Sequence, residues 1–190
     1  MKKLIATIAA GALLCVSGAA RAERSYGSRH GRGHAILVGM DTEFGIPLGN
    51  YADVNSVGLG ATVNGEYALM DMLGATARIG FQGHVDRTVN GLGSHVHAIP
   101  FLLGTKYYLG GERQGLFGAF ELGIFDLMSS VTRSPTVSAS SNDVKFGMGV
   151  GAGFQQDRWN VRVNVHTQDV GNFGSAFTIT GGFGYQFASF

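Results

Sequence analysis

Cysteine is nearly absent from this sequence, and no long apolar run follows its N-terminal segment. The only thiol belongs to Cys15, so a framework of disulfide bonds within the chain is excluded. A membrane-spanning helix needs about 20 consecutive apolar residues, and no segment after Ala22 approaches that length. If the protein crosses a membrane, it must therefore do so with strands.

Charged side chains are also scarce. They make up 14% of the chain, whereas a typical soluble domain has about 25%. Without Lys2, Lys3 and Arg21 there remain 11 basic and 13 acidic side chains, and this near balance offers no basic surface for nucleic acid. Much of the surface is therefore expected to face something other than water. What the chain has instead is 31 glycines and 13 phenylalanines, which favour strands over helices.

The N-terminus has the layout of a secretory signal. Lys2 and Lys3 precede an apolar stretch over residues 4–16, and small residues lead up to Ala22. This is the order of the charged, apolar and cleavage regions in such signals, so we expect Sec-type export and cleavage of residues 1–22. A leucine directly before Cys15 is too large for a lipoprotein cleavage site, and acylation of Cys15 is not expected.

The exported part divides into two regions. Residues 23–33 are rich in glycine, serine and arginine and are predicted to form a flexible periplasmic leader. Residues 34–190 are predicted to form one domain in which apolar and polar residues alternate, as they do in β-strands. Eight such runs are separated by turn residues: His34 to Ile46, Ser56 to Leu69, Leu73 to Val85, His95 to Leu109, Leu116 to Met128, Val144 to Phe154, Trp159 to Asp169 and Thr178 to Phe190.

The lengths of these runs and of their connections indicate a membrane barrel. Strands of about 11 to 15 residues are longer than is usual in soluble sheets and can cross a bilayer when tilted. The connections after the second, fourth and sixth runs are short and fall at the end with both termini, as in outer-membrane barrels. Loops are predicted over Asp86 to Ser94 and over Ser129 to Asp143, which is the longest connection and rich in serine.

Two prolines and two phenylalanines disturb the alternation. The first run is expected to end before Pro47, which opens a turn-rich segment. Pro100 does not fit within its strand, because proline in a sheet is normally restricted to edges and bulges. In the fifth run, Phe117 and Phe125 fall on the polar parity, which makes the facing of that strand the hardest to assign.

The two faces of the strands have the composition of a membrane barrel rather than of a soluble sandwich. One parity carries no charge between the strand ends, as contact with hydrocarbon requires. The other is rich in small polar residues and has isolated charges of both signs, which can neutralise one another inside a narrow barrel. The predicted lumenal charges are Asp41, Glu43, Glu66, Arg78, Lys106, Glu121 and Arg162. The predicted periplasmic aromatic girdle is Tyr67, Tyr107, Trp159 and Tyr185, with Phe187 beside them.

The last strand carries the most specific pattern. Its segment Thr180-Gly181-Gly182-Phe183-Gly184-Tyr185-Gln186-Phe187 resembles the insertion signal of bacterial outer-membrane barrels, and the matching residues are Thr180, Gly182, Tyr185 and Phe187. With the eight runs and the segment Ile99 to Tyr108, it makes the chain similar to the small barrels of the OmpA/OmpX type. Phe190 departs from the apolar parity, so a short tail or bulge is expected after Phe187. The resemblance implies an all-β, eight-stranded, antiparallel up-and-down transmembrane barrel.

The same resemblance implies a function without catalysis. A lumen filled by its own side chains would exclude solutes, and the protein would act in envelope integrity or surface interaction through its extracellular loops. We expect a monomer in the outer membrane, without a cofactor, whose partners are membrane lipids, lipopolysaccharide and the barrel-assembly machinery. The segment Ser129 to Asp143 is expected to be a solvated linker rather than an adhesive surface. A small channel for hydrophobic or ionic solutes and a soluble periplasmic sandwich are alternatives.

A lipid A-modifying enzyme and a metal site are further alternatives. The segment His166-Thr167-Gln168-Asp169 resembles the His-x-Ser arrangement of a barrel deacylase, but Gln168 stands at the serine position and Thr167 falls on the opposite face from His166. Such chemistry needs a nucleophile within reach of its base, so no catalytic residue is assigned. Imidazoles favour zinc, copper or nickel. The histidines near the predicted outer rim are His84, His95, His97 and His166, but their scatter over strand ends does not define a metal site.

Overall fold

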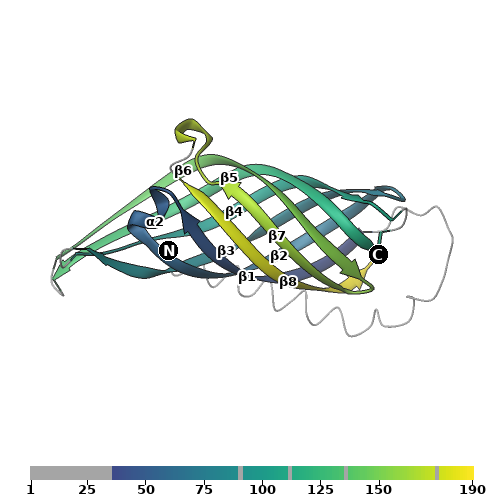
Figure 1. Cartoon of the computed structure of the whole chain (residues 1–190), viewed down its shortest axis with the longest axis horizontal. Helices are drawn as coiled ribbons and strands as arrows, with labels where there is room; N and C mark the ends of the chain where they lie inside the picture. Colours follow the sequence, from purple (N-terminus) through teal and green to yellow (C-terminus); the bar gives the residue numbers. More distant parts are fainter. Residues whose placement is uncertain (1–35, 90–91, 111–112, 135–136, 174–175) are drawn as a thin grey trace.

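The protein is a closed β-barrel (Figure 1). This computed structural model describes residues 36–89, 92–110, 113–134, 137–173 and 176–190. The predicted signal with Cys15 and the predicted leader over residues 23–33 lie outside these ranges. Among the described residues, no helix is long and apolar enough to cross a membrane.

Eight strands close the barrel, and each is antiparallel to its neighbours in the chain, with β1 also pairing with β8. The strands are β1 (Ile36–Leu48), β2 (Asn55–Met70), β3 (Leu73–Val89), β4 (Leu92–Tyr108), β5 (Gly115–Ser134), β6 (Val137–Gln156), β7 (Trp159–Thr167) and β8 (Phe177–Ser189). The connections contain a short helix α2 (Tyr51–Val54) and a 3-10 turn η1 (Val170–Asn172). The predicted eight-stranded, antiparallel up-and-down barrel is confirmed.

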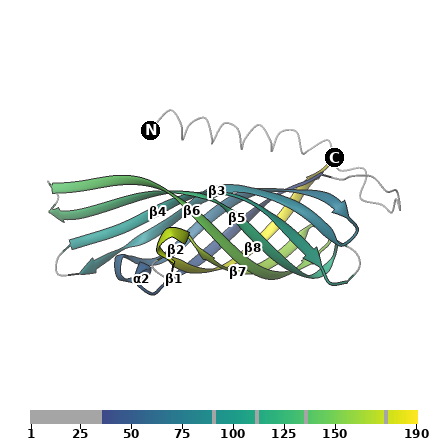
Figure 2. The same cartoon turned by 90° about the horizontal axis from the view of Figure 1, so that it is seen from above.

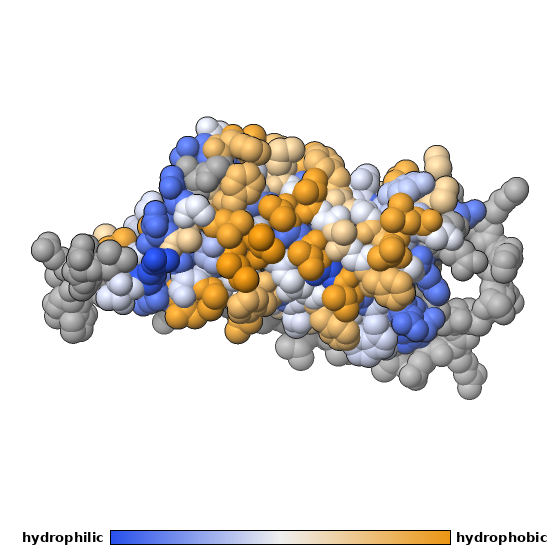
Figure 3. Space-filling view, viewed as in Figure 1, coloured by the Kyte–Doolittle hydropathy of each residue, from blue (hydrophilic) through white to orange (hydrophobic). Residues whose placement is uncertain are grey.

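Apolar side chains cover the outside of the barrel, and polar side chains fill the inside. On β7, Val161 and Val163 are exposed, whereas Arg162 and Asn164, which alternate with them, are buried. Figure 3 shows apolar side chains gathered over the barrel wall, with hydrophilic residues towards both ends. Because a soluble sandwich would bury its apolar parity between two sheets, the soluble alternative is wrong.

The end of the barrel with the C-terminus has short turns and a closed seam. Phe190 pairs with Ile36 through two backbone hydrogen bonds of 2.9 Å. Next to it, β1 pairs Val38 with Ala188 but Gly39 with Gln186, so one residue of β8 bulges out of the ladder. The tail or bulge predicted after Phe187 is therefore a bulge at Phe187 itself, and it brings the last residue back into register with β1.

The opposite end of the barrel is uneven, and two loop predictions there are wrong. β3 and β4 have 17 residues each, and β5 and β6 have 20 each. Most of the predicted loops Asp86 to Ser94 and Ser129 to Asp143 are strand, since Ser129 pairs with Ser141 and Arg87 with Ser94. Hydrophobic alternation marks only the membrane part of a strand, whereas backbone pairing continues beyond it. The four strands project past the others (Figures 1 and 2).

The two prolines behave differently from their predictions. Pro47 does not stop the first strand, because it still pairs with Thr178 of β8. Pro100 is fully buried in the middle of β4 and pairs with Phe125 of β5, although a closed barrel has no edge in which to place it. On the β3 side, Ile79 pairs with Phe101 and Gln82 with Ala98 around it. The ladder therefore continues on both sides of a residue that cannot donate a backbone hydrogen bond.

Candidate functional site

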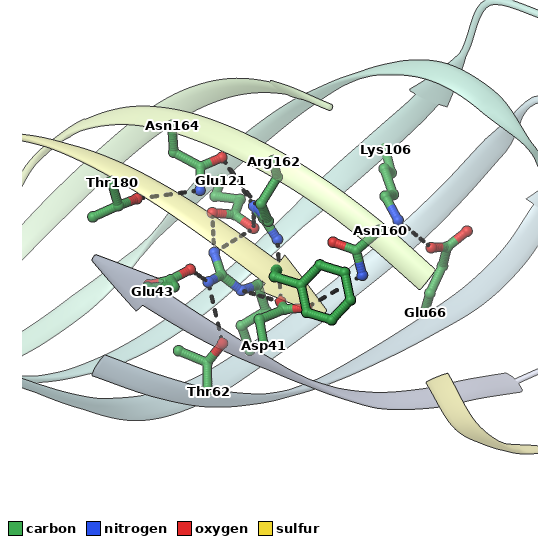
Figure 4. A network of polar contacts seen from close by, with 12 residues as sticks. Asp41, Glu43, Thr62, Glu66, Lys106, Glu121, Asn160, Arg162, Asn164 and Thr180 are labelled. Atoms are coloured by element: carbon green, nitrogen blue, oxygen red, sulfur yellow. Dashed lines mark hydrogen bonds and ion pairs between the residues drawn. The ribbon is translucent and has the colours of Figure 1, made fainter. Parts of the chain in front are cut away.

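A network of charged side chains crosses the middle of the lumen (Figure 4). Its centre is Arg78 of β3, which pairs with three carboxylates. Its Nη1 lies 2.8 Å from Oε2 of Glu121, its Nη2 bonds Glu43, and its Nε lies 3.8 Å from Asp41. The three carboxylates come from β5 and β1, on opposite sides of β3. All four side chains are at least 90% buried, so each needs its partner to stay charged away from water.

Arg162 of β7 gives this network its second cation. Its Nη2 lies 2.9 Å from Oε1 of Glu121, and its Nη1 lies 3.7 Å from Asp41. The same guanidinium donates at 3.0 Å to Asn164, whose amide reaches Thr180 of β8 at 3.4 Å. The central layer therefore links strands on every side of the barrel, with two guanidinium groups facing three carboxylates.

A second layer lies towards the short turns, at the end of the barrel with the C-terminus, and centres on Glu66 of β2. Nζ of Lys106 lies 3.2 Å from Glu66, and the hydroxyl of Tyr108 donates to the same carboxylate at 2.9 Å. Lys106 also donates to Gln155 at 3.3 Å and stands 4.3 Å from the centre of the Phe117 ring. These buried groups occupy the lumen between the central layer and the short turns.

The structure brings the seven predicted lumenal charges together in these two layers. Each points inwards, and none is more than 7% exposed. Their pairing could not be predicted from neighbouring strands: Arg78 meets residues of β1 and β5, and Glu66 meets Lys106 of β4 across the lumen. Among the described residues, small voids beside these layers have space for about one water molecule each.

Glycines on the inner parity make room for these side chains. A Cβ at Gly184 would overlap Asp41 and Asn160, and a Cβ at Gly153 would overlap the Phe117 ring. Gly147 stands in the same relation to Phe125. The two phenylalanines that disturbed the alternation thus point inwards, each above a glycine of β6, and this pairing of a large residue with glycine is the signal that sequence reasoning missed.

A third layer lies at the end of the barrel opposite the short turns. It was not predicted, because it depends on the short helix α2. Tyr51 of this helix is buried and stands edge-on to His84, with 5.6 Å between ring centres. Burial raises the pKa of the Tyr51 phenol above its usual value. Beneath it, Gln168 donates to Gln82 at 3.4 Å, and Gln82 donates to Glu43 at 3.2 Å. The outer layer is therefore connected to the central one.

The four histidines do not form one group. Nδ1 of His97 accepts from the backbone of His84 at 3.2 Å, while His95 stacks on His97 and lies 2.6 Å from Asp86. His166 is inside the barrel, stacked on Phe125. Among the described residues, no set of three histidine, cysteine or acidic side chains is placed to hold a metal ion.

The segment considered for catalysis is occupied by structural contacts. His166 lies on the lumenal parity of β7, and Thr167 lies on the other parity but is only 2% exposed. The Thr167 hydroxyl donates to the backbone of Asp169 at 3.2 Å. Gln168, at the position where a nucleophile was sought, is fully buried against Gln82. The Thr178 hydroxyl of β8 lies on the strand position opposite His166, but Nε2 of His166 has no hydrogen-bond partner among the described residues.

The predicted girdle residues lie on the outer surface near the short turns. Tyr67, Tyr107 and Trp159 are 38%, 47% and 49% exposed, and Trp159 packs on Tyr185 with 4.3 Å between ring centres. Of the residues matched to the insertion signal, Thr180 is buried in the lumen, whereas Tyr185 and Phe187 are partly exposed. A Cβ at Gly182 would press on the backbone of β1. The proposed recognition of this strand during insertion stays a prediction.

Comparison with known proteins identifies the fold. No family model matches the sequence, and no curated protein matches it. Among solved structures, the attachment invasion locus protein Ail of Yersinia pestis matches with a TM-score of 0.59 at 10% identity, covering 83% of this chain and 99% of Ail. The N-terminal barrel of Pseudomonas aeruginosa OprF matches with a TM-score of 0.56 at 12% identity, covering 81% and 97%.

A third match supports the same fold. Neisserial surface protein A gives a TM-score of 0.50 at 9% identity, covering 81% of this chain and 98% of its own. Each of these barrels is covered almost completely, which agrees with the closed sheet of eight strands seen here. The chain therefore has the fold of the small eight-stranded β-barrels of bacterial outer membranes.

Proposed function

We propose that the protein is an integral outer-membrane barrel without enzymatic activity that conducts no solute. It acts at the cell surface through the projecting ends of β3 to β6, which we name the outer sheet. The observation that carries this proposal is the filled lumen. The short turns would face the periplasm, and the projecting ends of β3 to β6 would face outwards. The exposed apolar wall between them fits the hydrocarbon region.

The filled lumen supports a closed barrel, because a solute would have to pass two layers of buried side chains one after the other. The layer near the short turns has Lys106, Tyr108 and Phe117, and the central layer has two guanidinium groups paired with three carboxylates. Opening the central layer would separate buried charges, and breaking a buried ion pair typically costs about 3 to 5 kcal/mol. The channel alternative would need such a separation in its resting state, and no observation favours it.

The outer sheet supports a role at the surface. It places polar strands beyond the membrane region on a rigid, hydrogen-bonded scaffold, and sites on strands are held more precisely than sites on loops. Ail and Neisserial surface protein A, which have the same fold, are named for attachment and for the cell surface. Their fold does not fix a function, so we base the proposal on the projecting strands of this chain.

Current recording across planar bilayers tests the closed lumen. We expect the refolded wild-type protein to give no steady conductance above that of the bilayer. The matched control is a variant in which Arg78, Arg162 and Lys106 are replaced by alanine, which removes the three cations of the lumen. If this variant conducts and the wild type does not, the side-chain plug is responsible. Large steady currents from wild-type protein would contradict the proposal.

A further inference from the structure

The outer half of β6 has a strand partner on one side and none on the other. β5 pairs with it along its whole outer part, from Val137 to Phe146. On its other side β7 ends at Thr167, which pairs with Met148. Over the described residues, nothing pairs with that side between Val137 and Gly147. A row of backbone donors and acceptors is therefore left open, and such an edge is a template for another strand.

The opposite edge of the same sheet is protected. There β3 passes beyond its last pairing with β2, between Asp86 and Asn55, and helix α2 covers it. Arg87 donates to the backbone carbonyl of Ala52, and the hydroxyl of Ser94 donates to that of Val54 at 3.0 Å. A charged residue and a covering segment are two common ways of protecting an edge strand. This sheet uses both at β3, whereas the stretch of β6 from Ala139 to Asn142 has no charged residue and is exposed.

Only the part of the β6 edge that is nearest to the end of β7 is covered. Nζ of Lys145 lies 3.6 Å from Asp169, just before η1, and η1 packs against β6. Beyond it, the residues from Ala139 to Asp143 are all exposed. From Ala139 to Asn142 the side chains are small or short, uncharged and without proline, so another backbone can approach closely. We name the residues Ala139 to Asp143 the open edge.

We propose that the open edge pairs antiparallel with the open edge of a second copy of this chain in a facing membrane. The proposal rests on the proposed function, because it takes the outer sheet as the active part of the molecule. It goes further by naming the partner. Pairing adds backbone hydrogen bonds to an existing sheet, the mode by which strands are commonly recruited to sheet edges.

Symmetry determines that the contact is between membranes. A closed contact between identical surfaces needs a two-fold axis, and two identical edges can share a regular hydrogen-bond ladder around such an axis only when their strands are antiparallel. In every copy β6 runs from the outer end towards the turn end. Two copies in one membrane therefore have β6 in the same direction, whereas copies in facing membranes have it reversed. Within one membrane the predicted monomer is retained.

The open edge is complementary to itself. Pairing centred on Ser141 places Asn142 opposite Ser140, and Asp143 opposite Ala139, so like charges are not opposed. The hairpin of β5 and β6 is among the farthest projections from the barrel in both views, which allows it to reach across (Figures 1 and 2). One contact of this size would be weak, but many copies on two facing surfaces act together and multiply its effect.

Vesicle tethering tests the proposal. Wild-type protein is reconstituted into two populations of phosphatidylcholine vesicles with donor and acceptor dyes, and clustering is followed by energy transfer, with protein-free vesicles as the baseline. We expect wild-type vesicles to cluster. Ser141→Lys should reduce clustering several-fold, because the pairing brings each lysine close to its own copy. Thr88→Lys, the same charge change at the protected β3 edge, should leave clustering unchanged.

A charge exchange makes the test specific for pairing between copies. Vesicles with Ser141→Lys and vesicles with Ser141→Asp should each stay separate alone and cluster when mixed. The proposal is overturned if wild-type vesicles do not cluster, if Thr88→Lys is as damaging as Ser141→Lys, or if the mixture stays separate. Absence of clustering from a protein that still gives no bilayer current would remove self-pairing but leave the proposed function intact, and the open edge would then belong to a strand of another protein.

Discussion

Arg78 is the side chain whose loss should change the barrel most, and replacing it with methionine is the sharpest perturbation of the lumen. Arg78→Met keeps an unbranched apolar stem in place of the aliphatic part of the side chain and removes the guanidinium with its charge. The wild-type guanidinium contacts Glu43, Glu121 and Asp41 and is 5% exposed. Without it, Arg162 is the remaining cation of the central layer, and among the described residues it pairs with Glu121 and Asp41 but not with Glu43.

The expected loss follows from the burial of Glu43. This carboxylate is 4% exposed, and its other hydrogen bond comes from the neutral amide of Gln82. Removing one partner of a buried ion pair typically costs about 3 to 5 kcal/mol, because the other charge stays buried and unpaired. We therefore expect Arg78→Met to lower the free energy of unfolding by about 3 to 5 kcal/mol.

The assay is urea unfolding of protein refolded into lipid vesicles, with the folded fraction read from the mobility of unheated samples on gels. A double substitution separates charge from packing. Adding Glu43→Gln to Arg78→Met removes the carboxylate charge that has lost its partner, so it should recover at least about 1 kcal/mol of the free energy of unfolding. The effects of the two substitutions are then not additive, as is usual for residues in contact. The matched control pairs Arg78→Met with Glu66→Gln. Glu66 bonds Lys106 and Tyr108 in the other layer, so this combination should be additive within about 0.5 kcal/mol.

Two results would refute the reasoning. A loss below about 1 kcal/mol for Arg78→Met would mean that water or protonation already satisfies the carboxylates, and that the layer is not a dry ion-pair network. Equal coupling free energies of Arg78 with Glu43 and with Glu66 would mean that the lumenal charges interact at long range, without the specific pairing of two separate layers.

Two further predictions use the same unfolding assay. Lys106→Met should cost about 3 kcal/mol or more, because it leaves the buried Glu66 without its cation, whereas Lys145→Met breaks the exposed pair with Asp143 and should leave stability almost unchanged; equal losses would contradict the burial argument. Gly123→Ala should cost about 1 to 3 kcal/mol, because its Cβ would overlap the backbone of β4, while Gly118→Ala on the same strand meets nothing within 4 Å and should not destabilise. Similar stabilities of the two alanine variants would show that the strands can move apart at little cost.

The barrel itself could be predicted because its strands repeat one simple rule. Alternation of apolar residues with glycine, threonine and isolated charges places Val161 outside and Arg162 inside, and this information is local. The same rule assigned the inner faces of Asp41, Glu66 and Lys106, although they lie on three different strands. Fold class and facing therefore needed no knowledge of how the strands are arranged around the lumen.

The partners within the lumen depend on arrangement and could not be predicted. Which charges meet is set by the register of each strand pair and by the closure of the sheet. Arg78 contacts Glu43 of β1 and Glu121 of β5, and neither strand carries a pattern that identifies the other. Glu66 and Arg78 lie on adjacent strands, and proximity in sequence would favour a pair between them, but they belong to different layers.

The outer end was the least predictable part, because its strands lack the pattern that marks the others. From Ser129 to Asp143 the chain is polar on both faces, which is also the composition of a loop. Cross-strand pairing nevertheless continues there. β5 is also held by β4 on its other side, with Gly93 opposite Thr132, so its outer part is extended and can pair with β6. Helix α2 has one turn only, and its role depends on Tyr51 entering the barrel mouth, for which the sequence around it gives no periodic signal.

The central claim is that this chain is a closed barrel resident in the outer membrane, and one gel comparison tests it directly. Protein extracted from isolated outer membranes is run unheated and boiled, since a closed barrel resists detergent until it is heated. The account predicts that the protein is found in the outer-membrane fraction and that its mobility changes on boiling. Protein in the soluble periplasmic fraction, with the same mobility before and after boiling, would contradict it.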